Sequence, residues 1–533
     1  MTESMTVYVP AMILQKGIGL ARLLLMVHLL SRVEYGLWAV GAFLFDVLAP
    51  VITLGSNHGL TRYVSFYEAR GEVRRFYRRI RLPILAVCVV LAGVALANSD
   101  LLARHVVASR AEAENAEAVE YMQICLAAIA NAFLIALYLN LLGFCYGLRT
   151  YRLVALLEIL FNVAFTAAAV VVIVAAPTGT AVLWAHSGSV ALSLVVGLLL
   201  LHAGMKRFHT GTSEEAETSE PLFSAGAEAD ENAALDALPT FSTETHETVA
   251  PDRLGGTLLR ILRYGFVALV SNVLWNLLGY VSYYLTHRRY GEEASGTFQA
   301  YMRLLGQPVM ALSAAAWAVV FTHVVRLWEQ HRSEDGEPAG EPSQPLQTLQ
   351  TAYKAVAMCL MTVGVLLYAT AGLWVHIMPG DTTTEGRTLV PGLLMFFQSL
   401  AHLALLTMLA KLRERPSVIA LAAVVGASAN VALALWWMPS AGPAGAATAA
   451  GVGMYLGGGA VAVCYFLVAR LPILPGTYLV LAAPALYLLP AWSAAVVWAA
   501  MLLTALLSRL LFSREEKQRL SSAGKGLLRR LHH

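Results

Sequence analysis

Long apolar stretches recur along almost the whole of this 533-residue chain, and they limit its fold more than any other feature. Hydrophobic residues make up 58% of the sequence and charged residues 13%, whereas soluble domains carry roughly 25% charged residues. About 20 consecutive apolar residues suffice for a helix to cross a bilayer, and a helix bonds its backbone groups internally, as a lipid surrounding demands. The sequence therefore predicts an all-α polytopic membrane protein.

Fourteen of these stretches are long enough to be spans. Six lie between residues 8 and 203, six lie between 259 and 469, and a tighter pair occupies 476–489 and 491–512. Pro472, Pro475, Pro484 and Pro490 interrupt that last pair, so a bundle of twelve spans is the alternative. We expect about 14 transmembrane helices in two six-helix lobes plus a C-terminal helix pair.

An acidic segment separates the two halves. Residues 211–250 contain ten Asp or Glu, no Lys or Arg, and many Ser, Thr, Ala and Pro, a composition typical of disorder. The expected organisation is an N-terminal lobe at 1–203, a disordered acidic cytoplasmic linker at 204–256, a C-terminal lobe at 257–470, the terminal helix pair at 471–512 and a basic cytoplasmic tail at 513–533.

The distribution of basic residues predicts the orientation. If the N-terminus is cytoplasmic, 28 of the 37 Lys and Arg residues fall on inner connections or tails and six fall on outer ones. Inner loops of membrane proteins retain the positive residues. We expect a multi-pass protein of the cell membrane with both termini in the cytoplasm.

A short similarity links the two halves. Residues 33–39 (VEYGLWA) near the second span are echoed by residues 293–300 (EASGTFQA) before the eighth. An internal repeat would place a substrate site between two lobes near the midplane, whereas a match of this length also arises by chance. Both interpretations stay open at this stage.

Several function classes are disfavoured. The formal net charge of only +3 argues against a nucleic-acid-binding protein, which would carry a large excess of basic residues. The five cysteines are scattered through apolar stretches without a paired motif, so neither a metal site nor a disulfide framework is predicted. No nucleotide-binding or hydrolase motif occurs, and the outer loops are short, so we expect no cofactor and no enzyme activity.

Polar side chains inside predicted spans are costly in lipid, and they are therefore functional candidates. In the eighth span they recur every four residues and share a helix face, and a similar stripe occupies the seventh. The candidates for substrate binding are Lys16, Arg22, Asn272, Asn276, Gln299, Arg303 and Gln307, and the possible coupling carboxylates are Asp46 and Glu158.

Each candidate also has a purely structural explanation. Lys16 can extend its stem to the inner interface, and an arginine can form an ion pair with Asp46. Asn272 and Asn276 can bond between helices.

Two deep guanidiniums with few opposing carboxylates indicate an anionic cargo. Low-dielectric walls strengthen the potential of Arg22 and Arg303, and guanidinium groups bind phosphate oxygens bidentately. Neighbouring amide and tyrosine groups provide the hydrogen bonds that sugars need. A phosphorylated glycan fits this combination, whereas a cation exporter would display more carboxylates.

Residues 29–39 (LLSRVEYGLWA), followed by 54–63 (LGSNHGLTRY), resemble the opening of bacterial polysaccharide biosynthesis proteins. These are the oligosaccharide flippases of the multidrug/oligosaccharidyl-lipid/polysaccharide exporter (MOP) superfamily. The resemblance implies a two-lobed bundle whose central cavity, walled by the first, second, seventh and eighth helices, translocates an undecaprenyl-diphosphate-linked glycan by alternating access.

The resemblance also implies roles for individual residues. Lys16 and Arg22 correspond to the cavity cations of the family, and Arg303 is supported by position alone. Arg62, which closes the matched motif, is the remaining candidate for substrate binding. The chain departs from the usual pattern at Thr53 and at residues 281–286 (VSYYLT), where the family commonly has acidic or Asp-Arg residues, so the coupling ion, H⁺ or Na⁺, stays undetermined.

The expected function is therefore transport of a lipid-diphosphate-linked oligosaccharide for the export of cell-surface polysaccharide. The expected partners are that polyprenyl-linked glycan, membrane lipids and a coupling ion, with no nucleic acid. One alternative is a multidrug or cation antiporter of the same superfamily, which would depend on Asp46 or Glu158. The other is a membrane glycan polymerase or ligase, which the short outer loops disfavour.

Overall fold

The computed structural model describes residues 2–68, 70–108, 118–207, 254–334, 344–377, 382–413, 415, 417–518 and 521. Nearly all of them are helical, and no strand occurs within these ranges. The predicted all-α membrane fold is confirmed. Most of the predicted acidic linker and of the basic tail lies outside the described residues.

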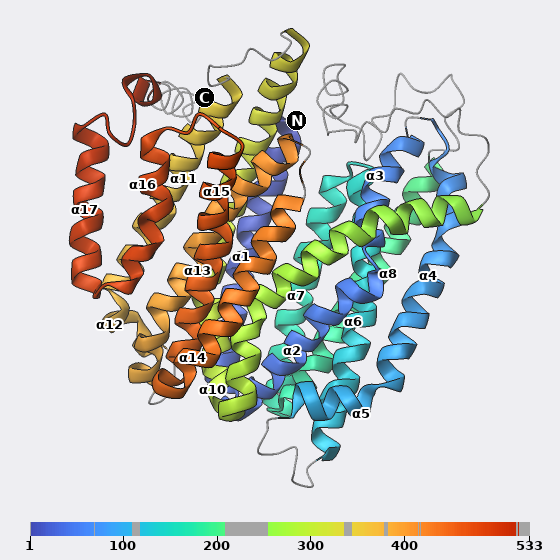
Figure 1. Cartoon of the computed structure of the whole chain (residues 1–533). Coiled ribbons are helices and arrows are strands. Elements are labelled where there is room, and N and C mark those ends of the chain that lie inside the picture. The colour runs from blue at the N-terminus through green and yellow to red at the C-terminus, as the bar shows by residue number, and fades with distance from the viewer. Residues whose placement is uncertain are drawn as a thin grey trace. The chain divides into compact units, whose positions relative to one another are not determined.

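The N-terminal part contains six long helices, as the apolar stretches predict (Figure 1). Their bounds are α1 (Thr2–Leu29), α2 (Arg32–Thr53), α4 (Val73–Ala97), α6 (Ala118–Gly147), α7 (Tyr151–Ala175) and α8 (Gly179–Arg207). Between them lie two short helices and a π-helical turn, which are α3 (Ser56–Glu68), α5 (Ser99–Leu102) and η1 (Ala103–Val107).

Two very long helices each contain a sharp break at a glycine. Helix α10 (Leu254–Glu334) has 81 residues, which would make a rod of about 120 Å, several times the thickness of a bilayer core. The backbone turns instead at Gly291, where φ is 80°. Helix α14 (Ser417–Tyr455) turns at Gly442, where φ is 60°. Such angles are open to glycine because it has no Cβ.

The remaining elements complete the predicted pattern. They are α11 (Gln344–Ala369), α12 (Ala371–Trp374), η2 (Val375–Ile377), α13 (Thr382–Leu412), η3 (Leu456–Ala460), α15 (Val461–Val468), α16 (Pro475–Ala482), η4 (Ala483–Leu488) and α17 (Ala491–Leu507). Eight helices in the described ranges are long and apolar enough to cross a membrane. With α10 and α14 each taken as two helices, and with α1 and the C-terminal pair added, the described chain contains the predicted groups of six, six and two.

The chain divides into two compact units. Of the described residues, 2–207 and 254–307 belong to the first unit, together with 382, and 308–377 and 383 onward belong to the second. The domain boundaries expected from the sequence stay a prediction.

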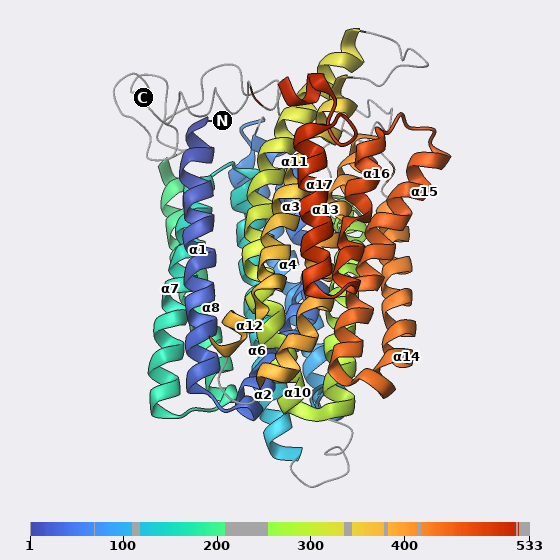
Figure 2. The same ribbon diagram turned by 90° about the vertical axis from the view of Figure 1, so that its left-hand side faces the viewer.

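Helix α6 lies at the centre of the first unit, where it packs against α2, α3, α4 and α8. Its fully buried Ala128, Ala132 and Ala136 recur every fourth residue, and small side chains let helices approach closely in a membrane. Helix α1 packs along α7, and α7 packs along α8 (Figure 2). These contacts place Arg22 on α1 beside the polar side chains of α7.

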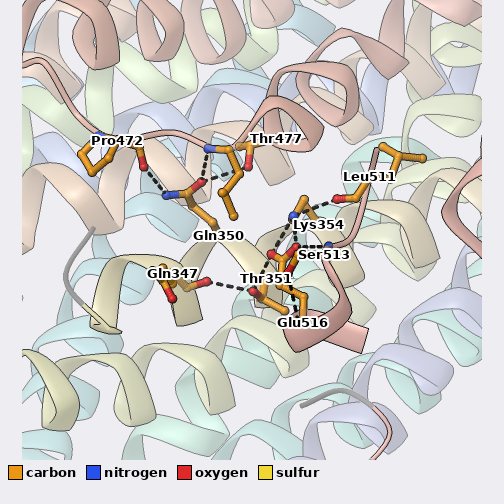
Figure 3. A network of polar contacts seen from close by, with 10 residues as sticks. Gln347, Gln350, Thr351, Lys354, Pro472, Thr477, Leu511, Ser513 and Glu516 are labelled. Carbon is orange, nitrogen blue, oxygen red and sulfur yellow. Dashed lines mark hydrogen bonds and ion pairs between the residues drawn. The ribbon is translucent and has the colours of Figure 1, made fainter. Parts of the chain in front are cut away.

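In the second unit, a buried polar network fastens the C-terminal helix pair to α11 (Figure 3). The Lys354 ammonium lies 2.6 Å from a Glu516 carboxylate oxygen, and their side chains are only 1% and 7% exposed. Lys354 also donates to the Leu511 carbonyl, and Thr351 donates to Glu516. One turn away, Gln350 donates to the Pro472 carbonyl and accepts from Leu474 N–H, both on the connection into α16, and it accepts from the Thr477 hydroxyl in the first turn of α16.

Candidate functional site

Arg22 is held against α7. Its Nη1 donates to the backbone oxygen and to Oδ1 of Asn162 at 3.4 and 3.3 Å, and to Oγ1 of Thr166 at 3.4 Å. Its guanidinium carbon lies 4.3 Å from the centre of the Phe165 ring. Asn162 and Thr166 are one turn apart and Phe165 precedes Thr166, so a single face of α7 orients the guanidinium. No carboxylate of the described residues forms an ion pair with it.

Arg303, in the second half of α10, has a different environment. Its guanidinium carbon lies 4.4 Å from the centre of the Trp38 ring on α2, which is a cation–π geometry. Among the described residues, none forms a hydrogen bond or an ion pair with this guanidinium. Its donors are therefore available for an external acceptor.

Asp46 on α2 faces the first half of α10. Its Oδ2 accepts a 2.8 Å hydrogen bond from the Tyr280 hydroxyl, and the charge of Arg303 lies close enough to act on the carboxylate. Arg303 and Arg22 are also close enough for their charges to interact. The two predicted cations and the predicted carboxylate thus share one electrostatic neighbourhood within the first unit.

Glycines bring α2 and α10 close together on either side of this neighbourhood. A Cβ on Gly296 would lie 2.8 Å from the Arg32 oxygen and 3.1 Å from Gly36 Cα, and a Cβ on Gly36 would overlap the Glu292 carbonyl. At the other end of α2, Gly55 and Gly265 meet backbone to backbone. The two glycines of the sequence echo, Gly36 and Gly296, therefore lie against each other.

In the described part of the chain, several buried polar atoms close to Arg303 or to α1 have no hydrogen-bond partner. They include Tyr35 Oη, Trp38 Nε1, Gln299 Oε1 and Gln307 Oε1. The Tyr35 and Trp38 rings lie 5.3 Å apart, and a Cβ on Gly19 would lie 3.2 Å from Gln307 Oε1. An unpaired buried polar atom costs about 1–3 kcal/mol, so a group of them requires an explanation.

The remaining charged candidates lie on α1 and α7. Lys16 is half-buried, and its charge acts on Glu158. The Glu158 backbone oxygen accepts a 2.9 Å bond from Asn162 Nδ2. The side chains of Arg62, Asn272 and Asn276 lie outside the described part of the chain, so their assignment stays a prediction.

Sequence reasoning missed several residues of this neighbourhood. Tyr35 and Trp38 stand in the quoted motif, but they were used there only for its resemblance. Their spacing of three residues, which places both on one helix face, was the available signal. His186 is buried against Phe45 and Phe165, and its Nδ1 lies 2.7 Å from Asn131 Oδ1, so its role is structural.

No family model and no curated protein matches the chain, but solved structures share its fold. The lipid II flippase MurJ in an inward closed conformation has 12% identity and a TM-score of 0.61, over 94% of this chain and 100% of that one. A MOP superfamily transporter from Pyrococcus furiosus has 13% identity and a TM-score of 0.55, over 88% and 94%. An inward-facing MATE family multidrug resistance transporter has 15% identity and a TM-score of 0.57, over 86% and 94%.

The chain therefore has the fold of the MOP superfamily, and it is a multi-pass membrane protein. This fold agrees with the resemblance of residues 29–39 and 54–63 to that superfamily. The flippase family within it stays a prediction.

Proposed function

We propose that the protein is a flippase that translocates a lipid-diphosphate-linked oligosaccharide across the cell membrane by alternating access, for the export of surface polysaccharide. The observation that carries the proposal is the Arg303 guanidinium, which lies over the Trp38 ring and donates no hydrogen bond to any described residue. A half-buried cation in this state attracts an anion, and a diphosphate offers oxygens that a guanidinium binds bidentately.

The second arginine supports the same cargo. Arg22 is oriented by Asn162, Thr166 and Phe165, and no described carboxylate neutralises it within ion-pair distance. In this proposal Arg22 and Arg303 hold the two phosphates, while Lys16 and Arg62 add positive potential along the path. Asn272, Asn276, Gln299 and Gln307 contact the glycan, and the polyprenyl tail stays in lipid.

The proposal also includes the orientation in the membrane, the side from which the cargo enters and the groups that respond to a coupling ion. The basic residues favour cytoplasmic termini, so the loaded lipid enters from the inner leaflet. Asp46 and Glu158 are the groups proposed to respond to a coupling ion, H⁺ or Na⁺. Among the neighbours, the lipid II flippase carries a lipid-linked cargo on this fold.

A multidrug or cation antiporter is the second candidate. It is favoured by Asp46, a carboxylate within a span that is hydrogen-bonded to Tyr280, and by the fold shared with MATE transporters. The Pyrococcus furiosus transporter, which is described as having a binding pocket of reverse polarity that suggests a different function, indicates that pocket charge separates functions within one fold. Two nearby guanidiniums against one neighbouring carboxylate favour the anionic cargo here.

The decisive experiment measures translocation of a fluorescent polyprenyl-diphosphate sugar in proteoliposomes. Replacing Arg22 and Arg303 by Ala removes charged hydrogen bonds that contribute about 1.5–3 kcal/mol each, so we expect the rate to fall at least about tenfold. Arg303→Lys keeps the charge but loses the planar fork, so its rate should be intermediate.

Arg289→Ala is the matched control, because Arg289 is an exposed cation of the same unit. Cells expressing the double variant should insert the protein normally and accumulate lipid-linked intermediates on the inner side. Unchanged translocation by the double variant would refute the anionic cargo. Loss of transport in Asp46→Asn together with tolerance of both arginine changes would identify the antiporter.

A further inference from the structure

Helix α4 buries one narrow stripe of side chains against the first unit. The stripe recurs every four residues, each at most 6% exposed, and consists of Phe76, Ile80, Ile84 and Cys88. Phe76 stacks on Tyr67 of α3, with ring centres 4.4 Å apart. These contacts fix the rotation of α4 about its own axis, so the residues opposite the stripe face outward.

Three arginines and two apolar residues form a continuous column on this outward side. The intervals between its members are four, three, four and four residues, which places them on one helix face. The column consists of Arg74, Arg78, Arg81, Leu85 and Val89. All three arginines are exposed, and the two apolar side chains are 39% and 52% exposed. A single face of α4 therefore changes from cationic to apolar along its length.

The arginines of the column have no partner within the protein. Among the described residues, none forms a hydrogen bond or an ion pair with Arg74, Arg78 or Arg81. Arg75, on a different face of α4, differs in this respect, because its Nη1 lies 3.7 Å from a Glu72 carboxylate oxygen. Three like charges within about two helical turns repel one another, so an anion that binds between them gains their combined potential.

The length of the column matches one leaflet of a bilayer. The helix rises about 16 Å from Arg78 to Val89, close to half of the roughly 30 Å hydrocarbon core. With the apolar part of the column in lipid, the arginines lie at the depth of the headgroups. The orientation predicted from the basic residues places them at the cytoplasmic leaflet, whose anionic lipids attract basic segments next to a span.

A basic segment at this place also helps to orient the chain in the membrane. Orientation depends on how many positive residues a connection carries and does not require them to share a helix face. The alignment of three unpaired arginines with an exposed apolar stretch is an additional feature. It fits a ligand that has a negatively charged head and an apolar tail.

We infer that Arg74, Arg78, Arg81, Leu85 and Val89 form a binding site for an anionic phospholipid. The guanidiniums bind the phosphate oxygens of the headgroup, and an acyl chain lies along the two apolar side chains. Because the lipid binds the folded chain, it stabilises the first unit. The site lies on α4, which contributes none of the candidate cargo residues, so this inference is independent of the proposed function.

The experiment measures lipid binding to the purified full-length chain in detergent, with no cargo present. The probes are phosphatidylglycerol and phosphatidylcholine with identical acyl chains, and native mass spectrometry records the lipid that each protein retains during a titration. Several arginines near an anionic headgroup each add to its affinity. We therefore expect the wild type to bind phosphatidylglycerol at least about tenfold more tightly than phosphatidylcholine.

A double variant tests the cationic half of the column. Arg78→Gln with Arg81→Gln should reduce the preference for phosphatidylglycerol to less than about threefold, because one guanidinium of the column is left. Both side chains are exposed, so the fold should not change. The matched control is Arg104→Gln with Arg289→Gln, which removes the same charge from two exposed arginines of the same unit. These two lie on the predicted outer side, and their loss should leave the preference intact.

A second double variant tests the apolar half. Leu85→Ser with Val89→Ser keeps all three arginines but removes apolar area that an acyl chain would cover. We expect it to weaken the binding of phosphatidylglycerol at least about fivefold. Glycerol phosphate carries the headgroup phosphate without acyl chains, and it should not displace phosphatidylglycerol at an equal concentration.

Each result supports or overturns the lipid site. Equal affinity of the wild type for the two lipids overturns it, and so does a preference that survives Arg78→Gln with Arg81→Gln. An equal loss of preference in the outer control would show that only the net charge of the protein matters. Displacement by glycerol phosphate, or unchanged affinity in Leu85→Ser with Val89→Ser, would mean that the arginines bind free phosphate and not a lipid.

Discussion

The Tyr280 hydroxyl donates a 2.8 Å hydrogen bond to Asp46 and thereby ties the first half of α10 to α2. Interhelical hydrogen bonds in membranes contribute about 0.6 kcal/mol on average and at most about 1.7 kcal/mol. We therefore predict that Tyr280→Phe lowers the free energy of unfolding of the purified protein by an amount in this range, which a thermal melt can detect as a lower melting temperature. Tyr284→Phe is the control, because the Tyr284 hydroxyl bonds the His105 carbonyl and not Asp46.

The same bond bears on ion coupling. If Asp46 exchanges a coupling ion, Asp46→Asn should abolish the dependence of transport on the ion gradient, while Tyr280→Phe should only change its steepness. Gradient-dependent uptake into proteoliposomes measures this. If transport by Asp46→Asn still depends on the ion gradient as in the wild type, Asp46 does not couple transport to the ion. The coupling group is then Glu158 or neither carboxylate.

The contact of Gly36 with the Glu292 carbonyl predicts a large effect from one methyl group. A Cβ at position 36 has no room, so Gly36→Ala must separate α2 from α10, and overpacking of this kind costs about 1–3 kcal/mol. In Gly188→Ala the new Cβ meets nothing within 4 Å, so that variant should be neutral or gain up to about 1 kcal/mol from helix propensity. Equal melting temperatures for the two variants would contradict the close packing.

The buried pair of Lys354 and Glu516 predicts a non-additive mutational result. Removing one partner of a buried pair leaves an uncompensated charge and costs about 3–5 kcal/mol, whereas replacing both by apolar groups is often close to neutral. We expect Lys354→Met to expose the segment after α17 to a protease, and Lys354→Met with Glu516→Leu to restore most of the resistance. Glu515→Gln, an exposed neighbour, should leave the digestion rate unchanged.

The pKa of Glu516 predicts how this attachment responds to acid. Burial alone would raise the pKa, but hydrogen bonds from Lys354, the Ser513 N–H and Thr351 outweigh it and hold the pKa of Glu516 below its ordinary 4.5. The stabilisation is therefore fully present above pH 4.5 and is lost as the pH falls through the folded-state value.

Limited proteolysis between pH 6 and pH 3 tests this response. Cleavage near residue 508 should accelerate only on the acid side of the range in the wild type, and the profile should flatten in Glu516→Gln. An acceleration that is identical in Glu516→Gln would assign the acid response to another group.

The helices follow directly from the sequence because lipid leaves few alternatives for an apolar stretch of this length. The start of the second span is set by a polar cap, because the Ser31 hydroxyl accepts from Glu34 N–H just before α2 begins at Arg32. The last span was expected to reach residue 512 but ends at Leu507. There, Lys517 donates to the Leu506 carbonyl in the last turn of the helix and to the Ser508 carbonyl just beyond it.

The candidate site was only partly predictable. The cost of charge in lipid identified Arg22, Arg303 and Asp46 individually, but their proximity depends on the packing of α1, α2 and α10. That Gln299 Oε1 lacks a partner is a property of the folded chain. The ion pair of Lys354 and Glu516 joins residues 162 positions apart, and no local pattern indicates such a contact.

The glycine contacts between α2 and α10 also bear on how the site can move. Gly36 with Gly296 and Gly55 with Gly265 touch through backbone atoms, so no change of rotamer can absorb a small displacement of either helix. Packed interfaces of this kind shift between discrete arrangements and do not deform continuously. The distance between Trp38 and Arg303 should accordingly stay constant until the whole α2–α10 interface switches to its other arrangement. In the proposed transport cycle, the cargo would then be released in one step and not by a gradual weakening of its contacts.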